Sequence, residues 1–300
     1  METVLKTEQL CKAFGTRLAV NNVSMTIEKG DIYGFIGKNG AGKTTLMRLV
    51  LNLIFPNSGS IELFGEKTLS EKNLMRVGSL IEAPSFFKKC SAWENMKRFA
   101  ILYGADDNEI KEALEAVSLA DTGKKKAEKF SFGMKQRLGI AIALLGKPDF
   151  IILDEPVNGL DPEGIKEMRD LILKLNHEKG ITFLISSHLL DELSKVVTKY
   201  GIIKDGILVE EISAAELKEK CGQSLKITLD DSEGAAALLS DKYGKDNIRI
   251  ENGCLFVSGH MSESAAINKL LFENGFSVSA MESISADIED YFIKMMGGAD

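Results

Sequence analysis

Residues 37–44 read GKNGAGKT and match the pattern GxxxxGK[ST]. The apolar run DIYGFI precedes them at residues 31–36, and a segment of helical periodicity, KTTLMRLVLNLI, begins at Lys43. A glycine-rich turn from a strand into a helix lets successive backbone N–H groups face phosphate oxygens, and the helix N-terminus adds the positive end of its dipole. This stretch therefore predicts a nucleotide site in a strand–loop–helix unit. The residues expected to hold the nucleotide are Gly37, Lys38, Asn39, Gly40, Ala41, Gly42, Lys43, Thr44 and Thr45.

A second polar stretch ends an apolar run, because residues 150–155 read FIILDE. Two carboxylates at the end of a buried strand are costly unless a cation offsets their charge. Together with the phosphate loop, this predicts that Asp154 and the hydroxyl of Thr44 hold Mg²⁺ and that Glu155 polarises the attacking water. Lys43 is expected to reach the β- and γ-phosphates of ATP. The alternative for the two acids is a solvated strand end without a ligand.

Short apolar runs alternate with helical stretches over the first two thirds of the chain. Buried strands that alternate with helices are typical of a mostly parallel sheet in an α/β fold. Strands are expected at residues 31–36, 150–153 and 181–185, and helices from residue 43 and at residues 108–117, 133–145, 164–175 and 189–200.

The segment after about Cys221 has a different pattern. Asn252-Gly253 lies between two short apolar runs and predicts a two-residue hairpin. Strands are expected at residues 225–229, 248–251, 254–258 and 276–281, and helices at residues 233–243, 263–273 and 287–296. The order βαββαβ followed by a helix is typical of a small α+β domain of the ferredoxin-like type.

Composition and charge exclude several classes of protein. The 300 residues are 44% hydrophobic and 27% charged, an ordinary globular mixture. Residues 214–300 hold 8 Lys/Arg and 15 Asp/Glu, a net charge of −7 that equals the charge of the whole chain, so no basic surface for nucleic acid is expected. The uncharged apolar stretches fall far short of the roughly 20 residues that span a bilayer. The four scattered cysteines predict reduced cytosolic thiols, and the first residues, METVLKTEQL, show no secretion signal.

Further motifs narrow the family. Residues 129–137 read KFSFGMKQR, residues 158–161 read NGLD, and Ser187-His188 follows an apolar run. Ser131 precedes Glu155 by 24 residues and His188 follows it by 33. In order and spacing, residues 3–215 resemble the ATP-binding cassette (ABC) ATPases. The resemblance implies a P-loop NTPase (RecA-like) cassette with antiparallel β and helical subdomains at residues 1–215, and it leaves residues 222–300 as an α+β accessory domain.

The resemblance also implies roles for single residues. Phe14, before a glycine, resembles the aromatic residue that stacks on adenine, although a core phenylalanine is the alternative. Ser131 and Gly133 resemble the signature motif, which contacts the γ-phosphate of ATP bound to a second subunit. Asp161 resembles the loop acid that crosses the dimer interface. His188 resembles the switch histidine that hydrogen-bonds the γ-phosphate and, with Glu155 and Lys43, completes the expected catalytic set.

The chain departs from the family pattern at two positions. The usual signature reads LSGGQ, and Phe132 replaces its first glycine, so backbone contacts are expected from Ser131 and Gly133 alone. Cassette ATPases usually carry glutamine where this chain has Glu82, in LIEAP at residues 80–84. A glutamate remains a hard oxygen ligand, so Glu82 is expected beside Mg²⁺. The alternative for Glu82 is a plain loop acid.

Glu82, a signature that ends in GMKQR at residues 133–137, and the C-terminal extension together resemble a narrower group, the bacitracin-resistance and lantibiotic-immunity (F-type) ATPases, although Phe132 is bulkier than expected even there. The resemblance implies ATP hydrolysis that drives export of membrane-active peptides through separately encoded polytopic permease subunits. It implies a second nucleotide-binding subunit, with a homodimer expected, no nucleic-acid partner, and a cytoplasmic location at the inner face of the membrane. The aromatic stretch from Phe86 to Trp93 is expected either to border the permease docking groove or to lie in the helical core.

Other functions stay open at this point. The ATPase could energise export of another amphiphilic compound. A cassette ATPase without a transport role is the other alternative, although one phosphate loop in 300 residues fits neither the two-cassette ribosomal type nor the chromosomal type with long coiled coils. Residues 222–300 could also regulate the ATPase or strengthen a dimer.

Overall fold

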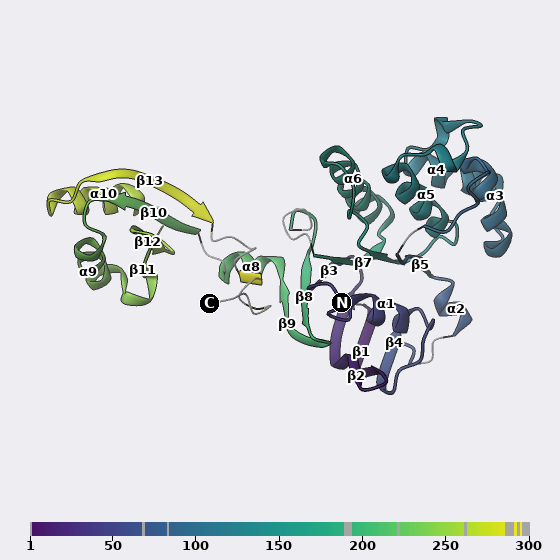
Figure 1. Cartoon of the computed structure of the whole chain (residues 1–300), viewed down its shortest axis with the longest axis horizontal. Helices are drawn as coiled ribbons and strands as arrows, with labels where there is room; N and C mark the ends of the chain where they lie inside the picture. The colour runs from purple at the N-terminus through teal and green to yellow at the C-terminus, as the bar shows by residue number, and fades with distance from the viewer. Residues whose placement is uncertain are drawn as a thin grey trace. The chain divides into compact units, whose positions relative to one another are not determined.

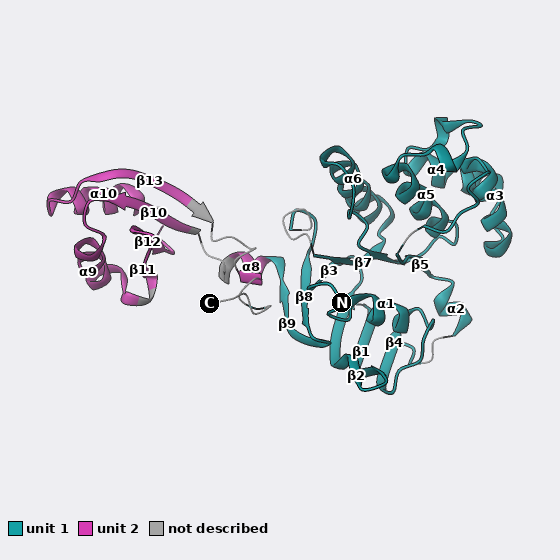
Figure 2. Ribbon diagram, in the orientation of Figure 1, with its two compact units in different colours: residues 1–214, 295–300 teal, residues 215–294 magenta. Residues whose placement is uncertain are grey.

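A computed structural model of the chain contains two compact units, which Figure 2 colours separately. Unit 1 comprises residues 1–214 with 295–300, and unit 2 comprises residues 215–294. The assignment of residues 1–215 and 222–300 to domains that fold independently remains a prediction. The structure describes residues 2–67, 70–82, 84–188, 194–220, 223–260 and 263–285, together with 291, 292 and 295.

Unit 1 is built around a six-stranded sheet, parallel except at one edge. Its strands, in spatial order, are β5 (Val77–Leu80), β6 (Phe150–Asp154), β7 (Thr182–Ser187), β3 (Ile32–Ile36), β8 (Lys199–Lys204) and β9 (Ile207–Ser213). Only the β8–β9 pair is antiparallel. Every residue of β3, β6 and β7 is buried, as expected for parallel strands covered on both faces. The carboxyl ends of these three strands meet at one edge of the sheet.

A second, antiparallel sheet of unit 1 has the order β2 (Arg17–Glu28), β1 (Thr3–Phe14), β4 (Ser58–Leu63). The helices are α1 (Lys43–Val50), α2 (Glu71–Leu74), α3 (Ala92–Tyr103), α4 (Asp107–Ala116), α5 (Phe132–Leu144) and α6 (Pro162–Lys179). Leu46 and Leu49 of α1 share one buried cluster with Leu5 of β1 and Ile152 of β6. Helix α1 therefore joins the two sheets, while α3, α4 and α5 form a helical group of their own (Figure 1).

Two sequence-based expectations for unit 1 are wrong. The helix expected at residues 189–200 is absent from its described part, because residues 194–198 form turns and β8 begins at Lys199. The N–H of Thr198 donates to the carbonyl of Ile32 at 2.9 Å, which places this β-branched segment beside β3. Residues 189–193 lie outside the described residues. Helix α1 also ends at Val50, several residues early, because Asn52 takes a left-handed conformation (φ +56°).

Unit 2 holds a four-stranded antiparallel sheet and two helices against one face. The strand order is β11 (Ile248–Glu251), β12 (Cys254–Ser258), β10 (Gln223–Leu229), β13 (Val278–Ser285), and the helices are α9 (Ser232–Tyr243) and α10 (Ser264–Glu273), after a short α8 (Ala214–Lys220). This βαββαβ order confirms the ferredoxin-like α+β prediction. Of the helix expected at residues 287–296, Tyr291, Phe292 and Met295 are helical and the rest lies outside the described residues. Among the described helices, none combines the length and apolar character needed to cross a bilayer.

Candidate functional site

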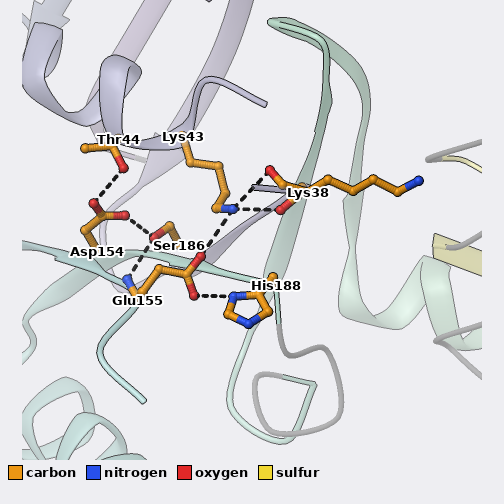
Figure 3. Close-up of polar contacts among 8 residues, drawn as sticks. Lys38, Lys43, Thr44, Asp154, Glu155, Ser186 and His188 are labelled. Carbon is orange, nitrogen blue, oxygen red and sulfur yellow. Dashed lines mark hydrogen bonds and ion pairs between the residues drawn. The ribbon is translucent and has the colours of Figure 1, made fainter. Parts of the chain in front are cut away.

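The phosphate loop connects β3 to α1 in a conformation that requires its glycines. Gly42 has φ +111°, and a Cβ atom there would lie 2.2 Å from the carbonyl oxygen of Ala19. The ammonium group of Lys43 is buried and donates to the carbonyl of Gly37 at 2.7 Å, with the carbonyl of Lys38 at 3.4 Å. The Lys38 side chain points away from this cluster (Figure 3). The loop therefore positions the Lys43 ammonium group where a phosphate would bind, and backbone carbonyl groups hold it there.

Asp154, at the end of β6, faces the start of α1. Its Oδ2 accepts a hydrogen bond from the hydroxyl of Thr44 at 2.7 Å, and its Oδ1 accepts one from the hydroxyl of Ser186 at 2.5 Å (Figure 3). The carboxylate is 4% exposed. Thr44 and Asp154, separated by 110 residues in sequence, are thus brought together as the sequence predicts.

Glu155 lies between two cationic or potentially cationic groups. Its Oε1 is 3.2 Å from the Lys43 ammonium nitrogen, and its Oε2 is 2.8 Å from Nδ1 of His188. The backbone of Glu155 is left-handed (φ +51°), which turns its side chain back over the phosphate loop. Strands β3, β6 and β7 therefore bring Lys43, Glu155 and His188 into contact, although the sequence spreads them over 145 positions.

The oxygens of this cluster fit Mg²⁺ in number and type. A hydroxyl and a carboxylate are the hard oxygen ligands that Mg²⁺ prefers, and the remaining positions are usually taken by water and substrate phosphates. Among the residues that the structure describes, no group of three or more His, Cys, Asp or Glu could hold a metal ion. Glu82 has a left-handed backbone (φ +61°), and its carboxylate pairs with Arg48, which follows Thr44 by four residues on α1.

A cleft of about 370 Å³ opens beside the phosphate loop and contains most of the predicted nucleotide residues. Phe14 is 53% exposed on its wall, so the core alternative for this residue is wrong. Arg17 also lines the cleft, where its Nη2 donates to the carbonyl of Gly40 at 2.9 Å. Sequence reasoning missed Arg17 and Ser186. For Arg17, the only signal in the sequence was its position three residues after Phe14. The lining residues are Phe14, Arg17, Ala19, Asn39, Gly40, Gly42, Lys43, Thr44, Thr45 and Glu155.

A second hollow of about 460 Å³ contains the signature residues Ser131 and Gly133 together with Asp161. It shares no lining residue with the cleft. Ser131 caps α5 by accepting from the N–H of Met134 at 3.2 Å, and Asp161 caps α6. Phe132 is 48% exposed, and its ring lies against Gly159. The three predicted residues thus lie together, apart from Lys43 and Glu155 of the same chain.

Comparisons with known proteins agree with this geometry. The family model described as ABC transporter matches residues 20–158. The chain is 44% identical to the bacitracin transport ATP-binding protein BcrA of Bacillus licheniformis over 99% of both chains. It is 43% identical to the lantibiotic transport ATP-binding protein SrtF of Streptococcus pyogenes, over 72% of this chain and 95% of SrtF. The solved ADP conformation of MJ1267, an ATP-binding cassette of an ABC transporter, is 26% identical with a TM-score of 0.66, over 72% of this chain and 93% of that one.

Proposed function

Because the chain belongs to the ABC transporter family of ATP-binding proteins, we propose that it energises the export of membrane-active antimicrobial peptides. The family membership makes it an ATP-hydrolysing transport subunit. BcrA is named for bacitracin transport and SrtF for lantibiotic transport, and this chain is more than 40% identical to both. Bacitracin and lantibiotics are both antimicrobial peptides, and this supports a peptide substrate for the chain.

The observation that carries the catalytic part is the contact of Glu155 with both Lys43 and His188. In the proposed mechanism, the γ-phosphate of ATP takes the place of the carbonyl groups that hold Lys43. Glu155 then orients a water molecule for in-line attack on the γ-phosphorus, and the bond to the ADP oxygen breaks. His188 fixes the Glu155 carboxylate on one side and donates to the γ-phosphate on the other. The protein supplies positioning and charge stabilisation rather than covalent chemistry.

Thr44 and Asp154 are the proposed protein side of the Mg²⁺ site. When bound, Mg²⁺ would neutralise charge on the β- and γ-phosphates during transfer. The hydroxyl of Thr44 and the carboxylate of Asp154, which lie 2.7 Å apart, would both hold the ion. Glu82 pairs with Arg48 instead of these two residues, so its proposed role beside the metal requires the Glu82 side chain to leave Arg48.

The other parts of the nucleotide are proposed to contact Phe14, Arg17 and the signature residues. Phe14 is proposed to stack on adenine, since its ring is exposed on the cleft wall. Ser131, Gly133 and Asp161 are proposed to act on ATP bound to a second copy of the chain. Their hollow holds two helix N-termini, those of α5 and α6, which favour an anion. A head-to-tail pair would complete two equal sites.

The helical group offers a surface for a permease subunit. Phe87, Ile101 and Leu102 are exposed, and Trp93 is exposed at the start of α3. A cation lies over two of these rings, since Arg98 is 5.2 Å from the ring centre of Phe87 and Lys97 is 5.9 Å from that of Trp93. Exposed aromatic groups beside cations are typical anchors for a partner segment. We therefore propose that the subunit binds its permease through this surface, at the inner face of the membrane.

The proposal is tested in two steps. The chain is purified from detergent-solubilised native membranes, and co-purifying polytopic subunits are identified by mass spectrometry. The chain and those subunits are then expressed in a peptide-sensitive bacterium, and growth is measured against bacitracin and a lantibiotic. Tolerance that is lost with Glu155→Gln supports peptide export. Recovery of partners without any membrane protein, or unchanged growth with all subunits present, contradicts it.

A further inference from the structure

The hydroxyl of Ser186 contacts both acids of the site. Ser186 lies on β7, directly opposite Asp154 of β6 in the parallel register, and its side chain is 0% exposed. Its Oγ donates to Oδ1 of Asp154 at 2.5 Å and accepts from the backbone N–H of Glu155 at 2.9 Å (Figure 3). One buried hydroxyl therefore satisfies a carboxylate oxygen and a backbone donor on the neighbouring strand.

We propose that Ser186 is a positioning residue for ATP hydrolysis, which sets the direction of the Asp154 carboxylate and of the Glu155 backbone together. The inference rests on the proposed roles of those two acids. It concerns a residue that the phosphate loop, the strand acids, the signature motif and Ser187-His188 do not include. Ser186 acts through its neighbours and needs no contact with ATP.

The argument for Asp154 follows from the geometry of a carboxylate. Its two oxygens are rigidly linked, so holding Oδ1 on Ser186 directs Oδ2 toward Thr44, where the distance is 2.7 Å. Among the described residues, the hydroxyls of Thr44 and Ser186 donate the hydrogen bonds that the Asp154 carboxylate accepts. If Thr44 turns to a metal ion, Ser186 remains as the donor that keeps the charged group oriented. Partners of this kind commonly fix ligands from behind.

The argument for Glu155 follows from its backbone. A left-handed conformation is unfavourable for a residue with a side chain, so it needs support from its surroundings. The N–H of Glu155 points at both the carbonyl oxygen of Ser186, at 3.2 Å, and the hydroxyl oxygen, at 2.9 Å. These contacts hold the turn that brings the Glu155 carboxylate to Lys43 and His188. Ser186 of β7 thus supports the backbone of Glu155, and His188, which directly follows β7, contacts its side chain.

The test compares two hydroxyl deletions on one strand. Ser186→Ala removes the proposed positioning group. Thr182→Val is the matched control, because Thr182 is also 0% exposed on β7 and its hydroxyl accepts from the N–H of Gly30 at 3.0 Å, far from the acids. Each full-length variant is measured for steady-state ATP hydrolysis, for Mn²⁺ affinity with ADP bound by electron paramagnetic resonance, and for thermal unfolding.

We expect both variants to unfold at lower temperature, because each loses a buried hydrogen bond. Only Ser186→Ala should lose Mn²⁺ affinity and kcat, each by about 10- to 100-fold, the usual effect of removing such a supporting partner. Ser186→Thr, which keeps the hydroxyl, should recover most of the Mn²⁺ affinity. In an Asp154→Asn background, deleting the Ser186 hydroxyl should have much less effect, since the interacting group is already changed.

Two results would overturn the inference. Equal Mn²⁺ affinity and kcat in Ser186→Ala and Thr182→Val would reduce Ser186 to a structural hydroxyl. Full additivity with Asp154→Asn would do the same. If Ser186→Ala folds poorly, Ser186→Cys replaces it in both comparisons, because a thiol nearly keeps the size of the side chain and is a weak donor and acceptor. A wild-type protein that neither binds Mn²⁺ with ADP nor hydrolyses ATP would contradict the proposed function instead, so the two failures are distinguishable.

Discussion

The six-stranded sheet of unit 1 and the four-stranded sheet of unit 2 distribute their polar residues in different ways. In the central sheet of unit 1, strands β3, β6 and β7 are buried along their whole length, and their functional polar groups follow at the carboxyl ends. In the sheet of unit 2, residues alternate: Leu225 and Ile227 enter the core with the helices, while Ser224, Lys226 and Thr228 lie on the other face. A parallel sheet therefore gathers polar groups at one edge, and an antiparallel one spreads them over a surface.

This difference favours the proposal that the chemistry lies in unit 1. Only there do a buried ammonium, two acids, two hydroxyls and an imidazole meet within hydrogen-bond or ion-pair distance, among the residues that the structure describes. If the comparison is right, substitutions at the sheet edge abolish hydrolysis, and substitutions in unit 2 leave it intact.

The largest effect is expected from Glu155→Gln. The variant keeps the shape of the side chain and removes the base, so kcat for ATP should fall by at least about 100-fold. ATP binding, measured by equilibrium dialysis, should persist, because Lys43 no longer shares its charge with a carboxylate. Hydrolysis near the wild-type rate would show that the Lys43–Glu155–His188 contact is not the catalytic centre.

A smaller effect is expected from Phe14→Ala, at the wall of the same cleft. Loss of base stacking should weaken ATP binding by about tenfold or more, since stacking on an aromatic ring is worth roughly 1–3 kcal/mol per base. The kcat at saturating ATP should change little, because the ring lies away from the γ-phosphate. Phe272→Ala is the control, since that phenylalanine is exposed on α10 of unit 2. Equal ATP affinity in both variants would remove Phe14 from the site.

The sequence predicts the cluster well because its members occupy the ends of conspicuous elements. A glycine-rich loop must follow a strand, and an acid pair after FIIL must leave the core, so Lys43, Thr44, Asp154 and Glu155 could be placed from pattern alone. Parallel strands then require their ends to meet. The roles of Ser131, Asp161 and His188 depend instead on the family resemblance, since a serine or a histidine alone carries no such constraint.

The errors have physical causes of a different kind. The apolar residues between 189 and 200 fit a helical period, but Tyr200 is buried on β8, which pairs with the edge of β3 that β7 does not occupy. Local pattern cannot show that an edge is free. Ser186 was missed for a similar reason: within an apolar strand it looks like a tolerated small residue, and only the register with Asp154 gives its hydroxyl a partner.

A weaker effect on hydrolysis is expected from Ile227→Ala in β10. Ile227 is fully buried in unit 2, so the substitution should destabilise that unit by about 2–5 kcal/mol. The ATPase rate at 25 °C should stay within about twofold, whereas the same change at Ile185 of β7, also fully buried, should impair both folding and activity. Calorimetry and hydrolysis assays together test this contrast. A parallel loss of ATPase in Ile227→Ala would show that residues 1–215 and 222–300 do not fold independently.

The smallest effect is expected from Glu94→Gln, at the third position of α3 in unit 1. The N–H of Ser91 donates to the Glu94 carboxylate at 2.6 Å, and this bond, with Lys126 nearby, lowers the pKa of Glu94 to about 2. A lowered folded-state pKa means that the charged form stabilises the protein above pH 4.5, the ordinary value, and that this stabilisation is lost as the pH falls toward 2. Glu94→Gln should therefore lower the melting temperature slightly at pH 7 and leave ATP hydrolysis unchanged. The melting temperature of the variant should also fall less steeply than that of the wild type between pH 4.5 and pH 2. Glu112→Gln removes the same charge from the exposed surface of α4 and is the charge-matched control. Identical pH profiles in the two variants would show that the capping carboxylate does not contribute.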